Sequence, residues 1–298
     1  MPIMSRSMHL ATGLLTTSLH HSATNRQQAE SGKHAGRGFT LVELIMVIAL
    51  AGIVAVMIST VMTRPLQGFA DQSRRAELTD LAATALNRMA RDIRLAVPNS
   101  LAVSKDEIRS VPIATAGRYR ANQPDPNGPR QDPPICAPLA GPCTIEILSP
   151  MEPQKDPGKH WLIIYNTGSL IGLPEPVDGT ISPISPKVFS WTGGVLSADL
   201  SNFRFAFASP QHRFYLANKV VGYRCAAGVL VRAEFPDLAA ADYSKASMVV
   251  NHVDCGKSSF TYEPGTNTRN GLVTLKLVLT NESGTVTLLQ QVHVDNAP

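Results

Sequence analysis

The 298-residue sequence lacks the features that mark several large classes of protein. It has no concentrated basic surface, because residues 1–38 carry +3 of the formal charge of +4 and leave about +1 for everything after Gly38. A nucleic-acid-binding role is therefore disfavoured. Its 22 prolines and 21 glycines follow no period, which excludes collagen-like and solenoid architectures. With 44% hydrophobic and 17% charged residues, the chain is predicted to be folded, as one large domain or two small ones.

Catalytic motifs are also missing. The sequence contains no G-x-S-x-G, no H-E-x-x-H and no Walker-type phosphate loop. Scattered acids such as Asp125, Asp132 and Asp156 match no calcium-loop spacing, so we expect them to be solvated loop charges rather than ligands. The histidines outside residues 1–38 are far apart in the sequence: His160, His212, His252 and His293. We therefore predict no enzyme activity, no cofactor and no metal site.

One segment dominates what is present. Phe39–Met62 is a run of 24 residues with a single charge, Glu43. As a helix it would span about 36 Å, enough for a bilayer core of about 30 Å. The apolar part of a secretory signal peptide is shorter, about 7–15 residues, and a core helix this apolar is rare in soluble domains. Lys33 and Arg37 just before it predict a cytoplasmic N-terminus, with the rest of the chain outside the cytoplasm.

Two features of this apolar segment call for an explanation. An ionisable side chain such as Glu43 costs several kcal/mol in a membrane helix and is by default functional; the alternative is that it snorkels to the interface from its position near the helix start. Ala51, Ala55 and Ser59 recur every four residues and would form a small-residue face, with Gly52 beside it, on which other helices can approach closely. Ordinary membrane-helix composition explains these small residues equally well.

The run from Gly38 to Glu43, Gly-Phe-Thr-Leu-Val-Glu, followed by an apolar helix, resembles the class III signal of type IV pilins and type II secretion pseudopilins. The resemblance implies that a prepilin peptidase cuts between Gly38 and Phe39 and methylates the new Phe39 amine. It also implies that Glu43 pairs with the Phe39 amine of a neighbouring subunit, which offsets desolvation and sets the axial register of the filament. Expected partners are other pilins or pseudopilins, the peptidase and an inner-membrane assembly platform. The leader of 38 residues is longer than usual, and Met4 and Met8 offer later starts.

The predicted domains are a removed leader (1–38), a membrane or filament-core helix (39–64), a stem helix (65–98) and a periplasmic head (99–298). Pro65 is expected to end or kink the first helix near Arg64. Apolar residues spaced at 3.6 then predict an amphipathic helix that packs on a sheet, and the stripe is too short to favour a coiled coil. The stripe consists of Leu78, Leu81, Ala82, Ala85, Leu86, Met89, Ile93 and Val97.

The head is predicted to be rich in β-structure. Residues 112–186 contain 15 of the 22 prolines, which predicts a loop-rich insert with short strands, at Thr144–Leu148, Trp161–Tyr165 and Lys187–Trp191. Alternation of apolar and other residues predicts half-buried strands over 203–208 and 273–280. Further strands are expected at Arg213–Ala217, Val220–Cys225, Val229–Phe235, Met248–Asp254 and Thr285–Val294. The fold class is α+β, with one long helix laid on an antiparallel sheet, as the pilin resemblance also implies.

All four cysteines follow the apolar segment. An even number in an exported domain suggests disulfides, with free thiols as the second possibility. A zinc site ranks last because the spacings are not C-x₂₋₄-C. We favour the pairs Cys136–Cys143 and Cys225–Cys255.

Three further segments resemble one subgroup of this family. Residues 88–103, 209–225 and 263–298 are similar to a minor pilin-like protein of the mannose-sensitive haemagglutinin (MSHA) type IV pilus, with the secretion pseudopilin J family as the nearest relative. The sequence thus favours a minor structural subunit that takes part in filament assembly or initiation. The alternatives are a type II secretion minor pseudopilin and a membrane-tethered extracytoplasmic binding protein, adhesin or enzyme. A chain that keeps its leader would favour the tethered protein.

Overall fold

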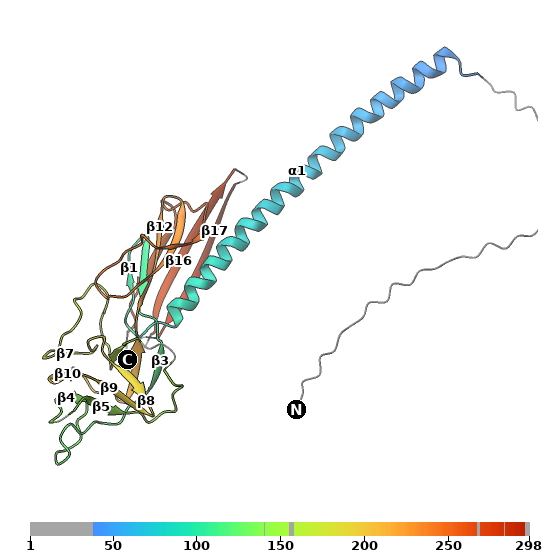
Figure 1. Cartoon of the computed structure of the whole chain (residues 1–298). Coiled ribbons are helices and arrows are strands. Elements are labelled where there is room, and N and C mark those ends of the chain that lie inside the picture. The colour runs from blue at the N-terminus through green and yellow to red at the C-terminus, as the bar shows by residue number, and fades with distance from the viewer. Residues whose placement is uncertain (1–37, 140, 155–157, 267–268, 283, 296–298) are drawn as a thin grey trace, which may run out of the picture. The chain divides into compact units, whose positions relative to one another are not determined.

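A computed structural model describes residues 38–139, 141–154, 158–266, 269–282 and 284–295, so the predicted leader before Gly38 lies outside the described residues. Within these ranges the chain forms one α-helix followed by 17 β-strands (Figure 1). The α+β class predicted from the sequence is confirmed. The described residues divide into two compact units, one ending at Thr60 and the other beginning at Val61.

The helix, α1, runs from Leu41 to Arg94 over 54 residues. It does not end at Pro65, where the sequence predicted an end or a kink. Proline removes one N–H and therefore one backbone hydrogen bond, but the bonds of the residues on either side can still hold the helix together. The helix ends three residues before Val97, where Val97 N–H donates to the carbonyl of Val111 (2.8 Å) instead of to its own helix.

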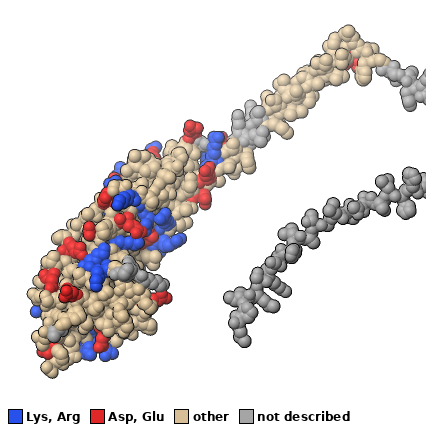
Figure 2. Space-filling model, viewed as in Figure 1, with Lys and Arg blue, Asp and Glu red and all other residues tan. Residues whose placement is uncertain are grey.

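The first unit contains the apolar part of α1. The span Leu41–Met62 has 22 residues and a mean hydropathy of 2.9, and none of it is buried. Figure 2 shows almost no charged side chain along this stretch, whereas Lys, Arg, Asp and Glu are spread over the head. Its length and composition are those of a membrane span, as predicted.

The second unit begins with the amphipathic part of α1, whose apolar stripe packs into the head. Leu78, Ala82 and Met89 are at most 2% exposed, whereas Leu81, also predicted on the stripe, is 36% exposed. The buried residues of α1 share one hydrophobic core with two sheets. The first sheet has the strand order β1 (Ala102–Val103), β2 (Glu107–Ser110), β12 (Val220–Ala226), β13 (Val229–Phe235) and β14 (Ser247–Val250). The second has the order β15 (Ser259–Glu263), β16 (Gly271–Asn281) and β17 (Gly284–Val294).

Three smaller sheets complete the head around two further hydrophobic cores. Their strand orders are β4 (Ile135–Cys136), β10 (Phe203–Phe205) and β7 (Ile181–Ser182); β3 (Thr115–Arg118), β11 (Arg213–Ala217) and β6 (Trp161–Ile163); and β5 (Cys143–Glu146), β9 (Val195–Ala198) and β8 (Ser190–Thr192). The expectation of a single antiparallel sheet is therefore wrong. The described strands form five sheets, and β10 pairs with β7 in parallel.

Some of the strands predicted from the sequence are present in full, and others end earlier than predicted. The hairpin of β16 and β17 is present with eleven residue pairs in unbroken register, and Val273, Leu275, Leu277 and Leu279 are buried on one face. Alternation fails after β10, because the strand ends at Phe205 and leaves Phe207 52% exposed. The segment predicted from Met248 to Asp254 forms a strand only as far as Val250.

Candidate functional site

The first candidate site is the start of α1, where the side chain of Thr40 caps the helix. Thr40 precedes the helix, and its Oγ1 accepts a hydrogen bond from the backbone N–H of Glu43 (3.2 Å). A Thr followed three residues later by Glu is the sequence of a capping box. Glu43 therefore lies in the first helical turn, where the helix dipole favours a negative charge. Sequence reasoning missed this local role of Glu43, although the Thr40-x-x-Glu43 spacing was its signal.

Gly38 and Phe39, the predicted cleavage site, stand clear of the rest of the described chain. Phe39 is 80% exposed. A Cβ added at Gly38 would meet no heavy atom within 4 Å, and the backbone there does not have the positive φ that favours glycine. Because the fold does not require glycine at this position, any requirement for it must come from a molecule that handles this segment. Cleavage after Gly38 and methylation of Phe39 remain predictions.

The predicted small-residue face lies further along the same helix. Ala51, Gly52 and Ala55 are exposed, and nothing lies within 4 Å of a Cβ built on Gly52. This face is open to another helix, as close packing in a membrane or filament core would require. Its role in helix packing stays a prediction, since the structure contains one chain.

A comparison with protein families bears on this segment alone. Residues 33–59 match the family described as the prokaryotic N-terminal methylation motif. The match includes Gly38, Phe39, Glu43 and the small-residue face, and it supports a subunit of the pilin-like or pseudopilin class. Such subunits are structural proteins that are anchored in the membrane and assemble with other pilins after processing by the prepilin peptidase. No curated protein and no solved structure matches the chain.

A network of polar residues fixes the amphipathic part of α1 to the head. The carboxylate of Asp92 accepts hydrogen bonds from Tyr223 Oη (2.7 Å) and Arg232 Nε (3.0 Å). Arg232 also donates to Glu234, which in turn receives a bond from Lys219 (2.8 Å). Burial tends to raise the pKa of Glu234, but its bonds to Lys219 and Arg232 outweigh that effect and hold the pKa below its usual range. Sequence reasoning missed this network because it joins residues more than 120 positions apart.

The cysteines form the two pairs that the sequence favoured, and no described cysteine is free. Cys136 and Cys143 are seven residues apart and join β4 to the start of β5. Cys225 and Cys255 are 30 residues apart and join β12 to the segment before β15. The second disulfide thus fixes the connection between β14 and β15 to β12 of the first sheet.

Removing the longer disulfide is expected to destabilise the head more than removing the shorter one. A cross-link restricts the unfolded chain more when it closes a longer loop, and each bond is worth about 2–4 kcal/mol. We expect Cys225→Ala/Cys255→Ala to lower the unfolding midpoint further than Cys136→Ala/Cys143→Ala in the mature chain in detergent. Near-ultraviolet circular dichroism during denaturation measures both midpoints. Equal midpoints would show that loop length does not govern this stability.

The histidines that the structure describes belong to no metal-binding group. His212 Nε2 lies 3.0 Å from Asp132 Oδ2, and Tyr119 Oη donates to the other oxygen of Asp132 (2.8 Å). This contact ties the proline-rich loop before Asp132 to the turn before β11. Among the residues that the structure describes, no group of three His, Cys, Asp or Glu side chains could hold a metal ion.

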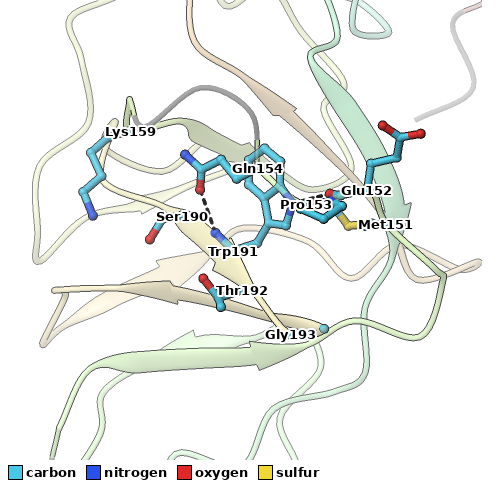
Figure 3. A pocket seen from close by; sticks show the side chains of 10 residues that line it. Met151, Glu152, Pro153, Gln154, Lys159, Ser190, Trp191, Thr192 and Gly193 are labelled. Atoms are coloured by element: carbon cyan, nitrogen blue, oxygen red, sulfur yellow. Dashed lines mark hydrogen bonds between the residues drawn. The ribbon is translucent and has the colours of Figure 1, made fainter. Parts of the chain in front are cut away.

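An open groove beside β8 is the other candidate site (Figure 3). It has a volume of about 760 Å³. Trp191 Nε1 donates to the carbonyl of Glu152 (2.9 Å), and the backbone N–H of Trp191 donates to the Gln154 side chain (3.2 Å). The groove combines one large aromatic side chain, Trp191, with a basic residue, Lys159, and an acidic residue, Glu152. It is lined by Met151, Glu152, Pro153, Gln154, Lys159, Ser190, Trp191, Thr192, Gly193 and Gly194.

Proposed function

We propose that the protein is a minor pilin-like structural subunit, cut after Gly38 and assembled into a filament through α1. The observation that carries this proposal is the arrangement at the start of the helix. Gly38, which the fold does not require, is followed by the exposed Phe39. Glu43, whose backbone N–H bonds to Thr40, is the single charged residue of the 22-residue apolar span and lies near its start. In this role Glu43 neutralises the Phe39 amine of a neighbouring subunit.

We further propose that the filament is an MSHA-type pilus and that the chain is its MshO-like subunit. The support is the similarity of residues 88–103, 209–225 and 263–298. In the fold these segments include the end of α1, the strand β12 and the hairpin of β16 and β17, which share the core around the helix. The similarity to the MSHA protein is therefore concentrated in the part of the head that packs against α1. The alternative, a type II secretion minor pseudopilin of the J type, rests on the same segments.

A test in the native host separates the two assignments. We expect an epitope-tagged chain to appear in sheared surface filaments, and to disappear from them when the MSHA assembly ATPase is deleted. Deletion of the type II secretion ATPase should leave it in place. The reverse dependence would assign the chain to the secretion system. A chain that never enters sheared material and keeps its leader would contradict both assignments and favour a tethered binding protein.

A further inference from the structure

The strand β17 lies at the edge of its sheet, and its outer edge is open. It has 11 residues, Gly284–Val294, and pairs with β16 on one side. On β16, the N–H of Thr280 bonds to the carbonyl of His252 and therefore points away from β17. Bonding sides alternate along an antiparallel pair, so the backbone groups of the opposite residue, Thr285, point away from β16. The outer edge of β17 thus carries the N–H and C=O groups of every second residue: Thr285, Thr287, Leu289, Gln291 and His293.

No residue in the described part of the chain bonds to these outward backbone groups. Proteins usually protect such an edge with charged side chains, proline, a bulge or a very short strand. The strand β17 contains no Lys, Arg, Asp, Glu or Pro, and all eleven of its residues pair with β16 without a bulge. An unprotected edge of this length is a template for pairing with another strand.

The inner face of β17 is also incompletely covered. Val286 and Leu288 pack against the core around α1 but remain partly exposed. The residues opposite them on β16, Leu279 and Leu277, are fully buried. The row of apolar side chains therefore ends at β17 without a neighbour on its outer side. A further strand there would remove the exposed parts of Val286 and Leu288 from water, which is favourable.

We propose that the outer edge of β17 binds an extended segment of a different protein, which joins this three-stranded sheet as a fourth strand. The segment pairs through its backbone with the nine positions Thr285–His293. Its apolar residues at alternate positions continue the row of Val286 and Leu288, because a charge in that row would be buried without a partner. Main-chain hydrogen bonds supply the affinity of such a contact, and the alternate side chains supply its specificity.

A second copy of the chain does not fit this edge. Every other edge strand of the described sheets has at most five residues, so none matches the nine positions. Contact of one β17 edge with another is isologous, whereas subunits along a filament meet through heterologous surfaces. The partner is therefore a different protein. That it is another subunit of the same filament rests on the proposed function.

Hydrogen–deuterium exchange of the assembled chain tests the pairing. Mass spectrometry compares the peptide that spans β17 in the tagged mature chain, isolated in detergent, and in sheared filaments that contain this chain. We expect the outward amides of β17 to exchange at least about tenfold more slowly in filaments. The peptide that spans β13 is the control and should not change, since β13 is already paired on both sides.

Two results of this measurement would overturn the proposal. One is exchange of the β17 peptide that is as fast in filaments as in detergent. The other is slow exchange in the isolated chain that becomes fast on dilution, because it would show that copies of the chain pair with each other.

Proline substitution tests whether the backbone of β17 makes the contact. Thr287→Pro/Gln291→Pro removes two outward N–H groups and leaves the bonds to β16 in place, as proline is tolerated on edge strands. We expect an unfolding midpoint close to that of the native chain and a several-fold loss from filaments. The control, Thr287→Val/Gln291→Val, keeps both N–H groups and should be incorporated normally.

Normal incorporation of the folded proline variant would overturn the pairing. An equal loss of the valine variant would assign the contact to side chains and would also overturn it. If the proline variant unfolds, the exchange measurement on the native sequence decides.

The intact mass of the exchange samples separates this inference from the proposed function. Chains that begin at Phe39 and enter filaments without protection of β17 contradict the pairing and leave the pilin-like role standing. Chains that retain the leader contradict the pilin-like role itself. The pairing is then tested by the same exchange comparison between detergent and native membranes.

Discussion

Replacement of Glu43 by Gln should leave the protein processed and in the membrane but almost absent from surface filaments. The helix start is preserved, because the Thr40 hydroxyl accepts from the backbone N–H of residue 43 whatever its side chain, and Gln is also common at this position of a capping box. The substitution removes only the charge that is proposed to neutralise the Phe39 amine of a neighbour. An unpaired charge buried by removal of its partner costs about 3–5 kcal/mol, which corresponds to a loss of about two to four orders of magnitude in assembly. Immunoblots of sheared filaments and of membranes measure this ratio.

The Thr40→Val variant is the matched control for Glu43→Gln. It removes the hydroxyl that accepts the Glu43 N–H and costs the helix about 1 kcal/mol, but it keeps the carboxylate. We expect it to be incorporated at close to the normal level. If Thr40→Val failed to assemble while Glu43→Gln assembled normally, the role of Glu43 would be helix capping and not subunit pairing.

Replacement of Gly38 by Val is expected to block processing completely. The added side chain meets no atom of the described chain within 4 Å of its Cβ, so the fold itself should tolerate it. A protease that must accommodate the backbone at this position has no such freedom, and the branched side chain should exclude the segment from its site. The expected result is a full-length chain held in the membrane and missing from filaments, seen as slower migration on a gel.

Gly36→Val is the control for Gly38→Val, because it makes the same change two residues earlier. It should be processed normally. Cleavage of the Gly38→Val chain at the normal position would show that Gly38 does not define the site.

Much of the N-terminal third of the chain could be predicted from the sequence because its signals are local. A 24-residue apolar run and a 3.6-residue stripe each specify a helix through neighbours in the chain, and α1 contains both. The exception is Pro65, where a local rule predicted an end or a kink. The helix continues through Pro65, because proline removes one backbone hydrogen bond while those of the turns on either side remain.

The arrangement of the head could not be predicted because its strands pair over long distances in the sequence. Val221 of β12 pairs with Ser110 of β2, and β10 lies between β4 and β7. The strand β16 was visible from alternation, but β15 was missed in a short run, Ser259–Glu263, that follows a turn. The Asp92–Arg232–Tyr223 network likewise joins residues that no sequence motif connects.

The central claim is that the functional protein begins at Phe39, with Glu43 close to its new amine. Intact-mass spectrometry of the native chain extracted from membranes tests it most directly. The predicted result is a single mature species that starts at Phe39, carries one N-terminal methyl group and contains both disulfides. A native chain whose mass still includes residues 1–38, or whose terminus lies elsewhere, would contradict the account.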